Sequence, residues 1–241
     1  RTTGGSFLLE SVVGGERWGR YSILGYRPKV TTVLRGEEGV DPFGELARLV
    51  PAGGEEVKDP AERFATAHVG LLAYDLVHYA TKVPTWPKEV QGPLARLLGE
   101  CTVVVFDHLT QTATIASTDA AHVSDAEVHL RDARILPPVA VPDSNALPAD
   151  LSVNKSDEEY SAMVERCREY IRAGDAFQIV PARTFSVPSD GTDPFEVYRS
   201  LRVLSPAPYM YFLDLPASED APAIAIAGAS PPACTVRIAA P

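Results

Sequence analysis

Two short apolar segments with a glycine turn between them occupy Phe7–Tyr26, near the start of the chain. The first segment ends in Glu10-Ser11, the turn is Gly14-Gly15, and the second segment covers Ser22–Gly25. Apolar runs of this length that are bounded by turn residues favour strands joined as a hairpin. The stretch therefore predicts an antiparallel pair of strands, and it is the local feature that most restricts the fold.

The charged residues of this hairpin allow two interpretations of its role. In the first, the stretch is a surface hairpin whose charges are solvated. In the second, it forms one lip of a ligand pocket, where Glu10 receives an ammonium group and Arg17 or Arg20 receives a carboxylate. The apolar flanks would then hold a ring. A site with few polar groups in an apolar lining suits an amino acid.

Further strands follow without a repeated strand–helix–strand pattern. We expect strands at Val30–Leu34 and Ala65–Asp75, and a hairpin that joins 101–106 to 112–116. Because Ala65–Asp75 is apolar on both faces after Val69, it should be a central strand, in which Gly70 lets another backbone approach closely. Near the end of the chain, strands are expected at 209–213 and 223–227.

Two helices are predicted from an Asp-Pro pair at their start. Asp41-Pro42 and Asp193-Pro194 each place Asp at the N-cap and Pro at the first helical position. The charged segment that leads from Gly54 to Arg63 is expected to be an exposed loop. With hairpins followed by capped helices and no βαβ alternation, the pattern predicts an α+β fold.

Two more helices are predicted from capping boxes. Ser124 with Glu127 predicts a short helix, and Ser156 with Glu159 predicts the clearest helix in the chain, which Gly174 ends. The second helix carries one continuous apolar stripe, which we expect to pack in the core. Its members are Tyr160, Met163, Val164, Cys167, Tyr170 and Ile171.

Four prolines between Ile135 and Asn154 mark the best candidate domain boundary. We therefore expect an N-terminal region at 1–136, a proline-rich linker at 137–154, and a further region at 155–241.

Composition excludes several classes of function. The 241 residues carry a net charge of −10, which argues against a nucleic-acid partner and against an anionic membrane surface. No run approaches the ~18 apolar residues of a membrane span. The three cysteines are far apart and the five histidines lack metal-ligand spacing. These features predict a cytoplasmic protein without a metal site in this chain.

Five segments in order resemble one family, the large subunit (component I) of anthranilate synthase, within the chorismate-utilising enzymes. The segments are Phe7–Gly25, Gly70–Asp75, Gly174–Phe185, Ser205–Phe212 and Gly228–Pro231. The resemblance implies an antiparallel β-sandwich with outer helices, incomplete in this chain. It also implies that 1–136 is a regulatory, tryptophan-binding region and that 155–241 begins a chorismate-binding catalytic domain.

The resemblance implies a lyase that converts chorismate and ammonia to anthranilate and pyruvate, the first step of tryptophan biosynthesis. A glutamine amidotransferase subunit (component II) would supply the ammonia, and Mg²⁺ would be the cofactor. The family's catalytic and metal-binding residues are expected beyond the last residue, so no catalytic residue is identifiable in this chain. The alternatives are a non-catalytic tryptophan-binding fragment and the sibling enzyme, aminodeoxychorismate synthase component I.

The family binds L-tryptophan as a feedback inhibitor. Carried over by motif, the tryptophan site comprises Glu10, Ser11, Arg20, Pro208, Tyr209 and Met210. The alignment at Arg20 could slip by one residue onto Tyr21. Glu10 and Arg20 would take the charged ends of the amino acid, and Tyr209 and Met210 would sandwich the indole.

For chorismate, the resemblance implies only the backbone of Gly228 and Ala229. Ser230-Pro231 should be followed by glutamate, but the chain has Pro232. We therefore expect either a chain truncated near a domain seam or a chain with an altered end.

Overall fold

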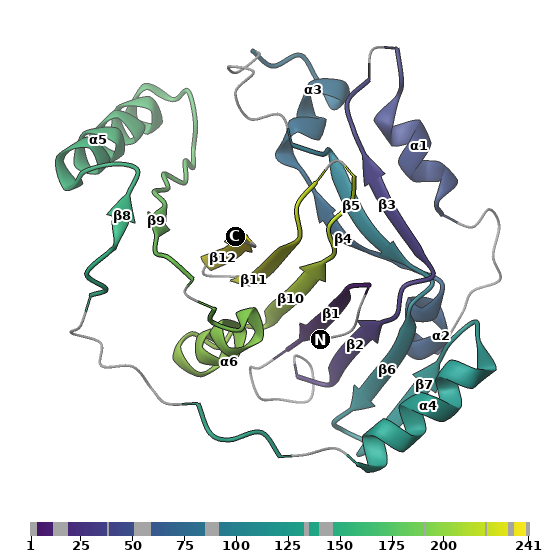
Figure 1. Cartoon of the computed structure of the whole chain (residues 1–241). Helices are drawn as coiled ribbons and strands as arrows, with labels where there is room; N and C mark the ends of the chain where they lie inside the picture. Colours follow the sequence, from purple (N-terminus) through teal and green to yellow (C-terminus); the bar gives the residue numbers. More distant parts are fainter. Residues whose placement is uncertain are drawn as a thin grey trace. The chain divides into compact units, whose positions relative to one another are not determined.

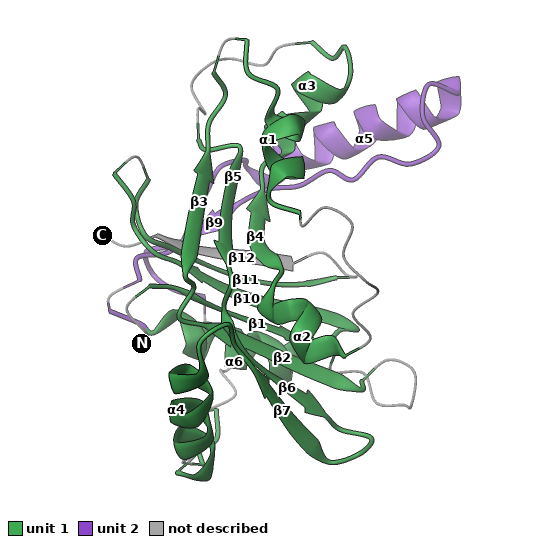
Figure 2. Ribbon diagram, turned by 90° about the vertical axis from the view of Figure 1, so that its right-hand side faces the viewer, with its two compact units in different colours: residues 1–140, 193–241 green, residues 141–192 purple. Residues whose placement is uncertain are grey.

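The computed structural model describes residues 4–11, 19–37, 39–50, 59–84, 92–132, 135–139, 147–189, 191–219 and 221–230, and the backbone alone for 234–239. Figure 1 shows the elements in chain order. The chain forms two compact units, residues 1–140 with 193–241, and residues 141–192 (Figure 2). None of the helices in the described ranges is long and apolar enough to span a membrane.

This division differs from the boundaries expected from composition. The second unit begins at Val141, inside the proline-rich segment. Residues 193–241, however, return to the first unit, because their strands pair with strands from the start of the chain. The predicted region 155–241 is therefore divided between the two units.

The larger sheet of the first unit is antiparallel and, within the described residues, has seven strands in the order β12-β11-β10-β1-β2-β6-β7. The strands of the predicted first hairpin, β1 and β2, pair with each other as expected. They are interior strands of the sheet and not an edge hairpin, because β10 and β6 flank them. The strand bounds are β1 Ser6–Glu10, β2 Tyr21–Tyr26, β6 Thr102–Asp107, β7 Thr112–Ala116, β10 Tyr209–Leu215, β11 Ile224–Ser230 and β12 Cys234–Ala239.

The smaller sheet of the first unit has the order β3-β5-β4, with β3 at Val30–Leu34, β5 at Ala95–Gly99 and β4 at His68–Leu72. The prediction that 65–75 contains a central strand is wrong, since β4 is an edge strand of this sheet. The central strand is β5, whose five residues are all buried. The apolar run around β4 reflects one partly buried face, through Val69 and Leu71, and the approach of β5 on one side only.

Two apolar clusters cover the two faces of the seven-stranded sheet. The first cluster joins this sheet to the smaller sheet and to the helix α2 (Pro60–Ala65), through residues such as Phe7, Leu98 and Leu213. The second cluster lies between the opposite face and the helix α6 (Pro194–Leu204), around Tyr198 and Met210. The α+β prediction is confirmed, and the shared core of the two sheets is consistent with the expected sandwich.

Three helices of the first unit begin at an Asp-Pro pair. They are α1 (Pro42–Arg48), α2 (Pro60–Ala65) and α6 (Pro194–Leu204). In each helix the aspartate side chain accepts a hydrogen bond from a backbone N–H of the first turn. The predictions for α1 and α6 are confirmed. The exposed loop predicted up to residue 63 is wrong from residue 60 onward, because Asp59-Pro60 starts α2 and Ala61 and Ala65 are buried.

Three further elements complete the described part of the first unit. The 3₁₀ turn η1 (Tyr74–Leu76) continues into the one-turn helix α3 (Val77–Ala80). The helix α4 (Ala120–Arg131) is capped by Asp119, so the capping box predicted at Ser124 is wrong. Ser124 lies inside the helix instead, where its hydroxyl bonds to the Ala120 carbonyl.

The second unit contains α5 (Asp157–Ala173) and the short strand pair β8 (Ser152–Val153) and β9 (Phe185–Ser186). The predicted capping box is confirmed, since Ser156 and Glu159 bond to each other's backbone N–H, and Gly174 ends the helix with φ 86°. The prediction that the apolar stripe of α5 packs in a core is wrong, because α5 has no buried residue. The few other residues of this unit offer that stripe too little surface to bury it.

Candidate functional site

Glu10 lies at a point where three strands meet side by side. It is the last residue of β1, with Met210 of β10 opposite it on one side and Ser22 of β2 on the other. Directly opposed residues of an antiparallel pair project from the same face of the sheet. That face carries the helix α6, so the strand register aims the carboxylate at this helix.

Two side chains of α6 reach the Glu10 carboxylate. Tyr198 donates a hydrogen bond from its hydroxyl to Glu10 Oε2 at 2.7 Å. Arg202 Nε lies 3.2 Å from the same oxygen. Tyr198 and Arg202 are four residues apart and therefore lie on one side of the helix. The helix thus binds the end of β1 through one hydrogen bond and one ion pair.

A short polar chain reaches the other oxygen of Glu10. Ser22 donates from its hydroxyl to Glu10 Oε1 at 3.2 Å, and His108 Nε2 lies 2.8 Å from the Ser22 hydroxyl oxygen. Because Ser22 has a single hydroxyl hydrogen, His108 has to donate from Nε2. This direction is opposite to that of a catalytic Ser-His pair, in which histidine accepts the serine proton.

The site contains one group whose ionisation is strongly shifted. Burial raises the pKa of the Tyr198 hydroxyl well above its usual range, and its hydrogen bond to the Glu10 carboxylate acts in the same direction. Tyr198 therefore stays protonated as a donor. The side chain of Glu10 is 12% exposed and that of Arg202 is 47% exposed, so the ion pair lies at the margin of the buried region.

The structure brings some of the predicted tryptophan-site residues together. Glu10 and Met210 are opposed across β1 and β10, and Ser11 follows Glu10 directly. The Ser11 hydroxyl is buried and has no hydrogen-bond partner among the described residues. An unsatisfied buried hydroxyl is costly, which suits an atom that bonds to a ligand.

The predicted sandwich of an indole between Tyr209 and Met210 is not the arrangement found. The two residues are consecutive in β10, and successive side chains of a strand project to opposite faces. Met210 is buried beneath α6, whereas Tyr209 is 60% exposed. Pro208, just before the strand, is half-buried.

Arg20, the predicted partner of a ligand carboxylate, is held elsewhere. Its Nε and Nη2 bond to the Asp107 carboxylate at 2.6–3.1 Å, and its guanidinium lies over the Tyr21 ring. The Arg20 hydrogen bonds hold the pKa of Asp107 well below its usual range. No contact of Arg20 with Glu10 occurs in the described part of the chain. Arg17, the other candidate, lies outside the described residues.

Comparison with known proteins points to one family. The sequence pattern of the family described as chorismate binding enzyme matches residues 12–234. The chain belongs to the chorismate-binding enzymes.

Named relatives agree with this assignment. Anthranilate synthase component 1 of Mycobacterium tuberculosis is 32% identical over 262 residues, which cover 95% of this chain and 50% of the relative. The Thermus thermophilus protein of the same name is 37% identical and covers 87% of this chain and 48% of the relative. The crystal structure of anthranilate synthase component I from Streptococcus pneumoniae superimposes with a TM-score of 0.63 and 25% identity, over 92% of this chain and 52% of that one. The chain spans about half the length of these relatives.

The two residues predicted to contact chorismate, Gly228 and Ala229, lie in β11. Ala229 is 3% exposed and packs in the cluster beneath α6. At Gly228, a Cβ atom would lie on the other face of the sheet and would overlap the ring of Tyr211, its partner on β10. Gly228 thus has a packing role, and a contact between its backbone and chorismate stays a prediction.

The described residues of this family member do not fit the expected Mg²⁺. Within the described ranges, no three His, Cys, Asp or Glu side chains come together as a metal-binding group. A magnesium site needs several oxygen ligands at short range. We therefore derive no metal-dependent step from the residues of this chain.

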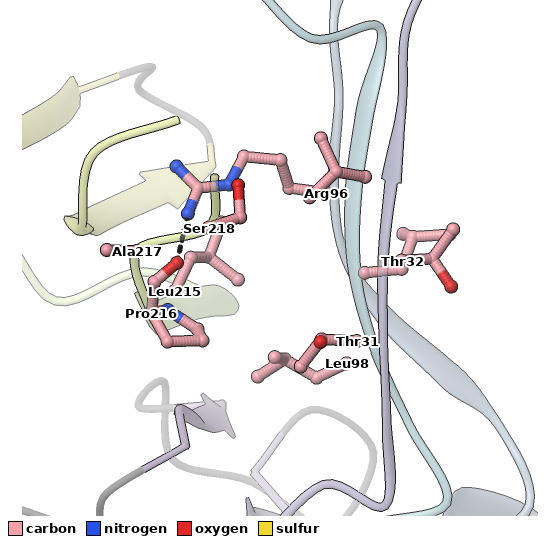
Figure 3. A pocket seen from close by; sticks show the side chains of 10 residues that line it. Thr31, Thr32, Arg96, Leu98, Leu215, Pro216, Ala217 and Ser218 are labelled. Carbon is pink, nitrogen blue, oxygen red and sulfur yellow. Dashed lines mark hydrogen bonds between the residues drawn. The ribbon is translucent and has the colours of Figure 1, made fainter. Parts of the chain in front are cut away.

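A small hollow also lies between the two sheets of the first unit (Figure 3). Thr31, Thr32 and Leu98 line one side, and the segment 215–218 lines the other. Arg96 extends across it to the Pro216 carbonyl, and it also donates to the Pro222 carbonyl at 2.8 Å. Because the guanidinium of Arg96 donates to backbone carbonyls of the β10–β11 connection, we interpret this hollow as part of the packing between the two sheets and not as a ligand site.

Sequence reasoning missed four residues of the Glu10 site, namely Ser22, His108, Tyr198 and Arg202. The i, i+4 spacing of Tyr198 and Arg202 shows that they share a side of α6. No local signal indicates that this side meets a carboxylate 188 residues earlier in the chain.

Proposed function

We propose that the protein to which this chain belongs is an anthranilate synthase component I. It would convert chorismate and ammonia to anthranilate and pyruvate, with ammonia drawn from glutamine through an amidotransferase subunit. The observation that carries the proposal is the match to relatives of this name over 87–95% of the chain. In this chemistry, ammonia bonds to the chorismate ring as the ring hydroxyl leaves as water. The enolpyruvyl group then takes up a ring proton and leaves as pyruvate, which makes the ring aromatic, with Mg²⁺ as the expected cofactor.

A direct assay tests the enzymatic proposal. The full-length protein that contains this chain is incubated with chorismate, ammonium and Mg²⁺, and anthranilate is followed by its fluorescence. Formation of anthranilate and pyruvate in equal amounts supports the proposal. Formation of aminodeoxychorismate instead assigns the protein to the sibling enzyme. Absence of both products, with a folded protein, contradicts either enzymatic function.

We also propose that this chain carries the site for L-tryptophan as a feedback inhibitor. Support comes from Glu10, which lies beside Met210 and at the margin of an apolar cluster, and from the buried Ser11 hydroxyl. A tryptophan-binding module without catalysis is the second candidate, and the same residues support it. The two differ in turnover and not in tryptophan binding.

Thermal unfolding of the 241-residue chain with and without L-tryptophan tests this site. A ligand that binds only the native state stabilises it by about 2.7 kcal/mol at a hundred times its dissociation constant. We expect a raised midpoint at millimolar tryptophan, lost in Ser11→Ala. No change of the midpoint in the unaltered chain at that concentration would contradict the proposed site.

A further inference from the structure

The second unit is an insertion in the first, because the chain leaves the first unit at residue 140 and returns to it at Asp193 (Figure 2). The return leads directly into α6, whose N-cap is Asp193. On the way out, the chain passes through residues 135–139, which follow α4 and which we call the exit segment. The anchoring of these two connections decides how freely the inserted unit moves.

Arg199 of α6 binds the exit segment. Its Nη2 donates to the Pro137 carbonyl, and its Nη1 donates to the two carboxylate oxygens of Glu196 at 2.9 and 2.8 Å. Arg199 lies less than two turns after Asp193, or ~9 Å along the helix axis. A single guanidinium therefore ties the segment that leaves the first unit to the start of the helix at which the chain returns.

The low exposure of Arg199 distinguishes it from other arginines that pair with a glutamate three residues earlier on the same helix. Its side chain is 16% exposed, whereas the side chains of Arg48 and Arg168 are 75% and 59% exposed. Exposed pairs of this spacing contribute little to stability. The partial burial of Arg199 and its contact with Pro137 are features of a helix that holds a second segment, and not of an ordinary surface pair.

The backbone at Pro137 suits this contact. A proline that precedes another proline, here Pro138, is restricted to an extended conformation. An extended backbone of this kind makes no internal hydrogen bonds, so its carbonyl is open to a donor from elsewhere in the chain. Because proline-rich segments are stiff, one contact at Pro137 also orients the neighbouring residues of the exit segment.

We propose that the contacts of Arg199 with Pro137 and Glu196 form a clasp that attaches the inserted unit at two points instead of one. A unit held only through its return connection would swivel around that connection. With the exit segment bound to the same helix, its movement is restricted to a hinge about the first turns of α6. Glu196 is a positioning residue, since its carboxylate fixes the guanidinium that binds Pro137.

Limited proteolysis measures how often the exit segment is released. In the 241-residue chain, an elastase, which cleaves after small apolar residues, is used to cut after Val139. Cleavage requires local opening of the segment, so its rate follows the population of the open form. We expect Arg199→Gln to raise this rate about tenfold, because it removes a charge-assisted hydrogen bond at a partly exposed site. Early cleavage at other bonds should change less than about twofold.

Two further variants sharpen this measurement. Arg48→Gln is the matched control, because Arg48 pairs with Glu45 on α1 with the same spacing, and it should leave cleavage after Val139 unchanged. Arg199→Lys keeps a positive charge beside Glu196 but lacks the planar fork that serves two acceptors, so it should raise the rate by about threefold. This variant also provides the test if Arg199→Gln does not fold.

The mobility of the inserted unit is measured with a dye on Cys167. Because Cys101 is buried, Cys234→Ser leaves Cys167 as the thiol that reacts in the folded chain. In time-resolved fluorescence anisotropy, a unit held at two points rotates mainly with the whole chain, whereas a swivelling unit adds a faster segmental decay. We expect this segmental decay to grow in Arg199→Gln and to stay the same in Arg48→Gln.

Three results would overturn the clasp. The first is equal cleavage after Val139 in Arg199→Gln and in the unaltered chain, and the second is an equal rise in Arg48→Gln. The third is faster cleavage without a larger segmental decay, since the exit segment would then be bound without restricting the inserted unit. None of these measurements uses a ligand, so failure of the clasp is distinguishable from failure of the proposed enzymatic function or tryptophan site.

Discussion

Gly70 shows how a single missing atom sets the spacing between two strands. It lies in β4 opposite Leu97 of β5, and a Cβ atom at Gly70 would overlap the carbonyl oxygen of Arg96. The expectation that another backbone approaches closely at this glycine is confirmed. Its partner is β5, a strand that sequence analysis had not identified.

Substitution of Gly70 by alanine should destabilise the first unit. The obstructing atom belongs to the backbone of a fully buried strand, so it cannot move aside as a flexible side chain would. We expect a loss of about 1–3 kcal/mol in the free energy of unfolding, as for other overpacked sites. Urea denaturation measures it, with Gly92→Ala as the control, since a Cβ atom there meets nothing within 4 Å. Equal midpoints for the two variants would contradict the close approach.

Cys101 should make stability depend on pH in the alkaline range. The side chain is fully buried, and burial raises the pKa of its thiol from 9.0 to about 12. Below pH 9 the thiol is protonated in both states, and its contribution to stability is fully present. Above that value the unfolded thiol ionises first, so this contribution falls as pH rises toward 12.

The measurement compares the unaltered chain with Cys101→Ala between pH 8 and 11. The unaltered chain should lose stability more steeply, by up to about 1.4 kcal/mol for each pH unit above the unfolded pKa. A thiol reagent at pH 8 should label the half-buried Cys167 and leave Cys101 unlabelled until the chain unfolds. Parallel pH profiles for the two proteins, or labelling of native Cys101, would contradict the prediction.

At the scale of single elements, the Asp-Pro pair occurs at three helix starts, of which two were predicted from the sequence and one was not. Asp41-Pro42 and Asp193-Pro194 were recognised as helix starts, whereas Asp59-Pro60 was placed in a loop. All three follow the same chemistry, since the aspartate accepts a backbone N–H that has no partner within the helix. The charged surroundings of α2 concealed the signal, although Ala61 and Ala65 show that one side of this helix is buried.

Removal of the α2 cap should therefore have a measurable cost. In the unaltered chain, the N–H groups of Ala61 and Glu62 donate to Asp59 Oδ1 at 2.7 and 3.3 Å. Both groups lose this acceptor in Asp59→Ala. We expect the free energy of unfolding to fall by about 1 kcal/mol. Asp59→Asn retains a capping oxygen and should recover most of this loss. If both substitutions cost the same, capping is not the reason that this residue stabilises α2.

At the scale of the whole molecule, Arg96 connects the two sheets of the first unit. It lies in β5 of the smaller sheet, is 6% exposed, and donates to the carbonyls of Pro216 and Pro222 in the connection between β10 and β11 (Figure 3). Proline carbonyls at such a connection have no sheet partner of their own, so a buried cation is an effective donor to both.

Arg96→Ala should be among the costly substitutions in this chain. It removes two charge-assisted hydrogen bonds and leaves two carbonyl groups without this donor, for which we expect a loss of about 3 kcal/mol. Arg48→Ala is the control, because Arg48 pairs with Glu45 on an exposed surface of α1 and should change stability by less than about 0.5 kcal/mol. Thermal unfolding of both variants provides the comparison. A similar, small change in each would show that Arg96 does not hold the sheets together.

The sequence by itself determined the features that depend on neighbouring residues. The start of α5 at Ser156, its end at Gly174, and the caps of α1 and α6 were predicted correctly, because capping bonds join residues two to five positions apart. The hairpin of β6 and β7 was predicted for the same reason. The Phe7–Tyr26 segment also carried the family resemblance that the comparisons confirmed.

Only the tertiary structure decided which strands become neighbours and which faces are covered. The pairing of β1 with β10 brings Glu10 to Met210 and beneath α6, where Tyr198 and Arg202 bind its carboxylate. It also decided that β4 is an edge strand and that no residue of the apolar stripe of α5 is fully buried. Contacts of this kind depend on the packing of segments far apart along the chain, and no local pattern of residue types encodes their partners.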